Sequence, residues 1–205
     1  MGVKRFIPSE FGSDTCNPKA RALPVFGDKI VVQDYLIKKA REGLIEYTLI
    51  MSGPFLDWCL KMGLFLDLKG RSVDLYDGGE TLFSTTSTQS VGEAVAGVLR
   101  HADETKSRAV YVEDILISQN RLVEMAEEIG GRKFEKKVVS TKEVEEGAYA
   151  EAKKENPNAW NWINFLKVGI WGEGFGGKFA RTDSEMMKVE MTEEGVKEMM
   201  AKCMA

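Results

Sequence analysis

The chain has 205 residues, of which 43% are hydrophobic and 29% charged, the profile of an ordinary soluble globular protein with one main domain. Its formal net charge of −4 argues against a nucleic-acid partner, because phosphate backbones are bound by basic surfaces. The three cysteines lie far apart and there is one histidine, so the sequence predicts neither a disulfide framework nor a metal site. No apolar run could span a bilayer and no secretory signal is recognisable, so we expect a cytoplasmic protein with no membrane contact.

The first two-thirds of the sequence alternates short apolar runs with amphipathic segments, which is typical of an α/β fold. A strand is expected at residues 3–8. A helix should begin near Lys29, with Asp28 as its N-cap and Gly43 at its end. The continuous apolar run at 47–51 predicts a strand that is buried on both faces of a parallel sheet.

The alternation continues through the middle of the chain. A short helix at 55–62 is expected to turn Trp58 and Cys59 inward. The segment 91–101 is an amphipathic helix, and we expect Ser90 to cap it. Further elements are expected as a strand at 72–76, a strand at 109–117, a helix capped by Ser118 and ended by Gly130-Gly131, a strand at 133–139 and a helix at 141–154.

The character of the sequence changes from Asn156 onward. Aromatic residues crowd the segment 160–171, which leads into a glycine-rich run at 172–177. A charged, methionine-rich helix is expected at 192–204. We expect this helix to cap the core, and an exposed methionine-rich interaction surface is the alternative.

The most specific stretch of the sequence is Val3-Lys4-Arg5-Phe6-Ile7-Pro8-Ser9-Glu10-Phe11-Gly12. It resembles the VKRF-x-PSEFG stretch of the isoflavone reductase-like (NmrA-like) reductases, which ends a central strand beside the nicotinamide of NADP. Lys29 with its helix and the segment 47–55 resemble the parts that follow in that family. The resemblance implies a partial Rossmann-like parallel sheet at about 1–105 and a C-terminal α+β substrate lobe at about 106–205, mixed with the sheet.

Lys29 is the main catalytic candidate. In the resembling family a lysine opens the helix after the PSEFG loop, and this lysine is kept here, whereas the family's arginines are replaced by Gln33 and Asp34. A lysine in a partly apolar pocket beside a cationic nicotinamide can have a lowered pKa and can exchange a proton during hydride transfer. Without the resemblance, the simpler interpretation would be an ordinary solvated lysine.

The resemblance also implies residues that line the cofactor. Ser9, Glu10 and Phe11 follow a parallel strand, at the edge where open α/β sheets bind their ligands. Ser52 and Phe55 match a Ser-Asn-x-Phe stretch that often ends the next strand in the family. The cofactor implied in this way is NADP. The simpler interpretation of residues 9–11 is a strand-exit turn with Phe11 in the core.

Substrate contacts are predicted at Gly53, Trp58 and Phe65. Gly53 stands where the family often has asparagine, so one polar contact is expected to be missing. Trp58, Phe65 and the segment 160–171 could form an aromatic wall for the substrate, although aromatic residues at such spacing more often belong to a core.

Two motifs compete with this interpretation. The run at 172–177 satisfies G-x-G-x-x-G, but no apolar helix follows it and no strand returns to close a βαβ unit, so we interpret it as a loop. Tyr35 and Lys39 have the Tyr-x-x-x-Lys spacing of short-chain dehydrogenases without a supporting serine, and are predicted to be structural. His101 is expected to be a solvated residue at a helix end.

The resemblance predicts an NAD(P)H-dependent oxidoreductase that transfers hydride to a small aromatic or conjugated substrate, with Lys29 as proton donor or acceptor. The family's glycine-rich pyrophosphate turn has no counterpart in the sequence, so we expect an N-terminally truncated relative. Two alternatives stay open: a non-catalytic NmrA-like regulatory or protein-interaction module, and an inactive fragment. Self-association through an exposed sheet edge is also expected, because an edge strand presents unpaired backbone groups.

Overall fold

The computed structural model describes residues 2–204, and they form the α/β fold that the sequence predicts. The strands are β1 (Arg5–Phe6), β2 (Glu46–Met51), β3 (Ser72–Tyr76), β4 (Phe83–Thr85), β5 (Arg108–Tyr111), β6 (Ile115–Ile117) and β7 (Glu135–Val139). The helices are α1 (Pro18–Arg21), the 3-10 turn η1 (Pro24–Phe26), α2 (Gly27–Arg41), α3 (Leu56–Lys61), α4 (Thr88–Arg100), α5 (Gln119–Gly130), α6 (Thr141–Ala152), α7 (Trp162–Trp171), α8 (Ser184–Met187) and α9 (Glu193–Met204).

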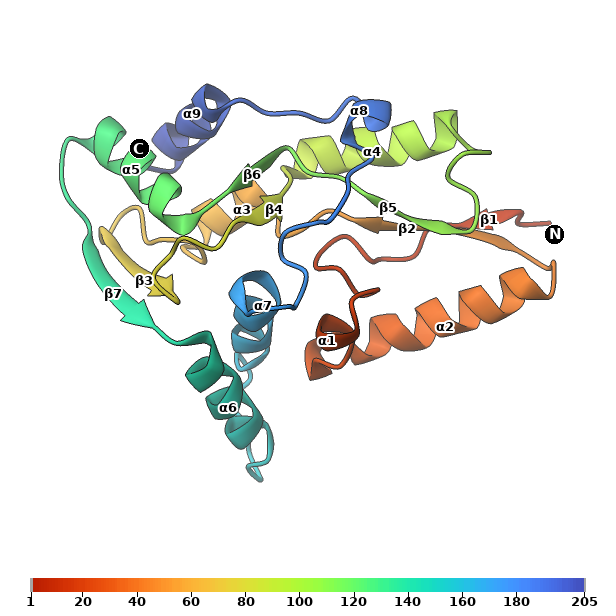
Figure 1. The fold of residues 1–205 in the computed structure, drawn as a ribbon, viewed down its shortest axis with the longest axis horizontal. Coiled ribbons are helices and arrows are strands. Elements are labelled where there is room, and N and C mark those ends of the chain that lie inside the picture. The colour runs from red at the N-terminus through yellow and green to blue at the C-terminus, as the bar shows by residue number, and fades with distance from the viewer. Residues whose placement is uncertain (1, 205) are drawn as a thin grey trace.

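The strands form three small sheets. The first has the order β1-β2-β5 with parallel pairs throughout, and it places β1 at an edge. The parallel pair β3-β7 and the antiparallel pair β4-β6 form the other two. Helices α4 and α8 lie on one side of the β1-β2-β5 sheet and α1 and α2 on the other (Figure 1). This two-sided cover explains why β2 is an unbroken apolar run.

The two halves of the chain share these sheets. β5 pairs with β2, and β7 pairs with β3, so strands that follow residue 105 lie beside strands that precede it. The division near residue 105 itself stays a prediction. None of the helices in residues 2–204 is both long and apolar enough to cross a bilayer.

Three details of the elements differ from the sequence prediction. α2 begins at Gly27 without a side-chain cap, and Asp28 lies in its first turn, where its charge complements the helix dipole. α4 is capped by Ser87 and not by Ser90: the Ser87 hydroxyl accepts a hydrogen bond from the Ser90 amide. The strand predicted at 109–117 is two strands, because the chain leaves β2 and turns to pair with β4.

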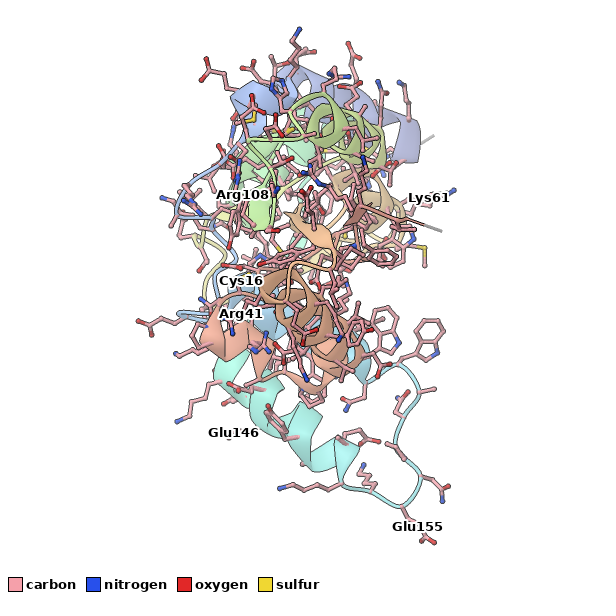
Figure 2. All side chains as sticks on the ribbon, turned by 90° about the vertical axis from the view of Figure 1, so that its right-hand side faces the viewer. Cys16, Arg41, Lys61, Arg108, Glu146 and Glu155 are labelled. Carbon is pink, nitrogen blue, oxygen red and sulfur yellow. The ribbon has the colours of Figure 1, made fainter. Side chains whose placement is uncertain are left out.

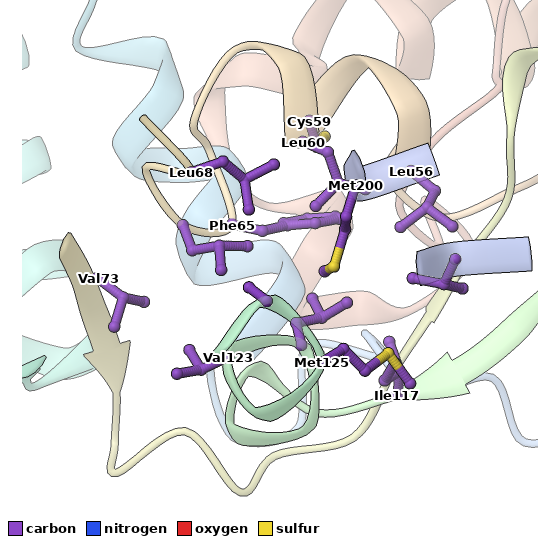
Figure 3. Close-up of a cluster of buried hydrophobic side chains, with 14 of the residues drawn as sticks. Leu56, Cys59, Leu60, Phe65, Leu68, Val73, Ile117, Val123, Met125 and Met200 are labelled. Carbon is purple, nitrogen blue, oxygen red and sulfur yellow. The ribbon is translucent and has the colours of Figure 1, made fainter. Parts of the chain in front are cut away.

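The largest hydrophobic cluster lies between α3, α5, α7 and α9 (Figure 3). Phe65 and Met200 are fully buried in it, so α9 caps the core as predicted. Trp171 stacks on Tyr76 with 4.5 Å between ring centroids. Buried aromatic pairs of this kind stabilise a fold beyond their area alone. The segment 160–171 therefore contributes partly to the core.

Candidate active site

A pocket of about 270 Å³ opens where the chain leaves β1 and β2. Its walls come from the loop after β1, the start of α2, the loop after β2, and helices α3 and α7. The arm formed by α6 and the following loop, with Glu146 and Glu155, stands out from the body (Figure 2) and leads back to α7. Among the described residues, Lys29 is the one lysine, arginine or carboxylate in the lining. The apolar side chains that line the pocket include Phe11, Phe26, Phe55, Trp58, Trp162 and Leu166.

The backbone beneath the pocket is fixed by a close contact between the two strand exits. The Gly53 amide donates a hydrogen bond to the Gly12 carbonyl at 2.9 Å. Gly53 has a φ of +63°, and a Cβ on this residue would lie 2.1 Å from the Ser84 carbonyl oxygen. Asparagine tolerates such a φ but carries a Cβ, so only glycine fits here. The polar group that the resembling family often has at this position is excluded by sterics.

Lys29 lies in the first turn of α2 and is half-buried. Its ammonium donates a hydrogen bond to the main-chain carbonyl of Glu10 in the loop after β1. Burial lowers the pKa of Lys29, and the negative charge of Glu10 opposes this change. The first turn of a helix adds no stabilisation for a cation, because the dipole there is positive. Lys29 is thus a lysine whose proton is held less tightly than usual.

The carboxylate of Glu10 turns away from the pocket. Only 1% of the residue is exposed, and its Oε2 accepts a hydrogen bond from the Thr15 hydroxyl at 2.6 Å. Its Oε1 is buried without a partner among the described residues. Burial raises the pKa of Glu10, while Thr15 and the positive charge of Lys29 lower it. Glu10 thus offers its main-chain carbonyl, and not its carboxylate, to Lys29, and its predicted place beside the cofactor stays a prediction.

The structure brings together several of the other predicted residues. Phe11, Gly53, Phe55 and Trp58 line the pocket beside Lys29. Trp58 is 42% exposed, so it forms an outer wall and does not face inward as predicted, whereas Cys59 on the next position is buried.

The remaining predicted residues lie outside the lining. Ser52 is buried beneath the pocket and donates a hydrogen bond to the Gly53 carbonyl at 3.0 Å. Ser9 is exposed on the loop surface. Phe65 belongs to the core, 5.0 Å from Phe83 between ring centroids, and is not part of this wall.

Phe26 and Trp162 are aromatic residues that also line the pocket and were not predicted as individual site residues. Trp162 belongs to the aromatic segment that the sequence singled out, so its aromatic character was a usable signal. Phe26 lies in η1, directly before α2. Its closeness to Lys29 in the sequence was the one signal that could have predicted its place in the pocket lining.

The two competing motifs lie elsewhere. The run 172–177 is a loop that follows helix α7 and leads to α8 without a strand, so its interpretation as a loop is confirmed. Tyr35 is exposed on α2, and the Lys39 ammonium lies 5.8 Å from its ring centre and 2.7 Å from Glu42. Neither residue lines the pocket. His101 is the C-cap of α4, the helix end at which it was expected.

The pocket fits the nicotinamide end of a dinucleotide. Flat aromatic walls such as those of Phe11, Phe55 and Trp58 suit a planar ring. Within residues 2–204, no glycine-rich turn joins a strand to a helix in the way that pyrophosphate binding requires. The fit therefore extends to the nicotinamide end alone.

The fold and the pocket together define a class of protein. The model of the NmrA-like family matches residues 1–155, and the chain belongs to this family. The fold is shared with isoflavone reductase at a TM-score of 0.73 and 22% identity, over 98% of this chain and 66% of that one. The complex of AtPrR2 with NADP⁺ and (+)pinoresinol matches at a TM-score of 0.74 and 21% identity, over 98% and 65%.

Curated relatives are similar in sequence over part of the chain. Oxidoreductase aprR of Aspergillus flavus is 36% identical over 121 residues, which cover 58% of this chain and 40% of the relative. Oxidoreductase poxI of Penicillium oxalicum is 35% identical over 142 residues, which cover 65% and 44%. The chain thus spans less than half the length of these relatives.

Proposed function

We propose that the chain forms the nicotinamide and substrate side of an NAD(P)H-dependent oxidoreductase of the isoflavone reductase-like type. The observation that carries this proposal is the half-buried Lys29 in an apolar pocket at the ends of two parallel strands. Open α/β sheets bind their ligands at this edge. The NADP⁺ in one structural neighbour and the NADPH in another support the choice of cofactor.

NADPH, when bound, supplies a hydride. Phe11, Phe55 and Trp58 would hold the nicotinamide ring and the substrate and keep water from the reacting atoms. Lys29 would donate a proton from its Nζ to the substrate atom that becomes negative, and its hydrogen bond to the Glu10 carbonyl orients the ammonium. The aromatic lining favours a small aromatic or conjugated substrate.

Replacing Lys29 by methionine is expected to separate binding from chemistry. NADPH should still quench the fluorescence of Trp58 and Trp162, because the apolar walls remain. NADPH oxidation with a panel of aromatic enones should fall by about 100-fold or more, the usual contribution of a positioned acid. The matched control is Lys39→Met, which removes a partly exposed lysine of the same helix outside the pocket and should leave both signals unchanged. Absence of saturable quenching at millimolar NADPH would contradict the proposed function.

A further inference from the structure

A row of hydrogen bonds connects the surface of α1 with the buried carboxylate beside Lys29. Arg21 donates to the Oε1 of Gln33, the Gln33 Nε2 donates to the Thr15 hydroxyl at 3.2 Å, and Thr15 donates to Glu10 at 2.6 Å. Gln33, Thr15 and Glu10 are each 1% exposed or less. These four residues come from the loop after β1, from α1 and from α2. We call them the relay.

The direction of every bond in the relay follows from Arg21. A guanidinium has donors only, so the Gln33 oxygen must face it and the Gln33 amide nitrogen must face Thr15. The Thr15 hydroxyl already accepts one bond and must give its proton elsewhere. The alternative acceptor, the Met51 sulfur, is weak and lies 3.7 Å away, so the proton points to Glu10. All donors of the relay therefore point toward one carboxylate.

Such an arrangement favours the ionised carboxylate. Hydrogen bonds donated to a charged acceptor are about twice as strong as those between neutral groups, and chains of bonds polarise one another. The opposing effect is burial, which favours the neutral acid, and the Oε1 of Glu10 has no partner to offset it. The charged or titratable groups that face Glu10 are Lys29 on α2, Arg21 on α1 and the Cys16 thiol in the loop between β1 and α1.

We propose that the relay holds Glu10 ionised and that Glu10 is a positioning residue, which orients the Lys29 ammonium through its carbonyl and keeps Lys29 protonated through its charge. The proposal deepens the proposed function, since it rests on Lys29 as the proton-handling residue. The proposal fixes the direction of proton transfer. A Lys29 that stays protonated can donate a proton, as reduction of a substrate requires. A variant without the relay holds Lys29 in a state better suited to accept one.

The test is a pH titration of Lys29 itself. Protein labelled with [ε-¹³C]lysine is titrated by NMR without cofactor or substrate, and the Lys29 signal is assigned by its loss in Lys29→Arg. In Glu10→Gln the midpoint should shift to lower pH, because the negative charge that raises the pKa of Lys29 is gone. The control Glu42→Gln removes an exposed carboxylate just after the same helix and should leave the midpoint unchanged.

A matched pair at Thr15 tests the relay rather than the charge alone. Thr15→Val keeps the shape and removes the hydroxyl, so Glu10 should take up a proton more readily and the Lys29 midpoint should shift in the same direction as in Glu10→Gln. Thr15→Ser keeps the hydroxyl and should titrate like the wild type. This pair also decides the question if Glu10→Gln does not fold.

Two results would overturn the proposal: an unchanged midpoint in Glu10→Gln, or equal midpoints in Thr15→Val and Thr15→Ser. Because no cofactor is present in the titration, its outcome is independent of turnover. Loss of NADPH oxidation alone would remove the proposed reaction and leave the coupling between Glu10 and Lys29 standing. Normal NADPH oxidation together with unshifted Lys29 midpoints would support the proposed reaction and exclude the coupling between Glu10 and Lys29.

Discussion

Gly53 is the residue on which the backbone of the candidate site depends most directly. Adding a Cβ would place it 2.1 Å from the Ser84 carbonyl, in a backbone conformation that already disfavours side chains. We expect Gly53→Ala to lower the free energy of unfolding by about 3 kcal/mol or more. The control is Gly43→Ala, at a φ of +73° with no atom within 4 Å of the added carbon, which should cost only about 1 kcal/mol. Urea denaturation of both variants would measure the difference, and equal costs would contradict the steric argument.

Lys29 should leave a signature in the pH dependence of stability. Its pKa is lowered in the folded protein, so the native state binds fewer protons than the unfolded one above that lowered value. The free energy of unfolding of the wild type should therefore rise with pH, relative to Lys29→Met, between the lowered pKa and the ordinary value of 10.5. Urea titrations from pH 7.5 to 10.5 would show it. Parallel curves for the two proteins would mean that burial does not perturb Lys29.

The sequence predicted which residues lie near the site better than it predicted the orientation of their side chains. Lys29 could be predicted because both the lysine and the helix that it opens resemble those of the NmrA-like family. The inward turn of Glu10 could not, because it depends on Thr15 and on Gln33, which lies one helix further along. From the sequence alone, a carboxylate next to a strand end could point toward a ligand or toward buried hydrogen-bond donors.

At the scale of elements, apolar periodicity predicted most of the longer helices, whereas α7 and the short helices α1 and α8 were not predicted. The amphipathic α4 and α5 were placed within a few residues, and the Ser118 cap of α5 is confirmed by its bond to the Arg121 amide. α7 is mostly apolar and contributes both to the core and to the pocket, and its segment was predicted only as a cluster of aromatic residues. The break between β5 and β6 follows from a change of pairing partner, which no local pattern encodes.

The C-terminal helix α9 should stabilise the fold through one face. Met200 is fully buried in the largest cluster, so Met200→Ala should cost about 2–4 kcal/mol by removing apolar contacts and leaving a cavity. Glu198→Ala changes an exposed position of the same helix and should change stability by less than about 0.5 kcal/mol. Thermal or urea unfolding of the two variants is the measurement. A small effect of Met200→Ala would mean that α9 is not part of the cooperative unit.

At the scale of the whole molecule, the alternation of strands and helices was sufficient to predict an α/β class with parallel pairing. It could not predict that the strands separate into three sheets, because pairing between distant strands such as β3 and β7 is a long-range event. The chain covers about two thirds of the solved structures that share its fold. The NmrA-like family and this shared fold account for the parallel core, and the proposed chemistry is assigned to the pocket on its edge.

We propose that the edge of the β1-β2-β5 sheet mediates self-association with a second copy of the chain. β1 pairs only with β2 among the described residues, and its Phe6 is 45% exposed beside backbone groups on the open side. Two such edges can pair with each other, since each presents unpaired donors and acceptors. Sedimentation over roughly 1–100 μM should show a dimer that Phe6→Lys weakens by about tenfold or more, because a charge on an edge strand opposes pairing. Leu99→Lys changes an even more exposed apolar residue, on α4, and should leave the dimer intact. A monomer at every concentration, or equal weakening by both variants, would place self-association elsewhere or exclude it.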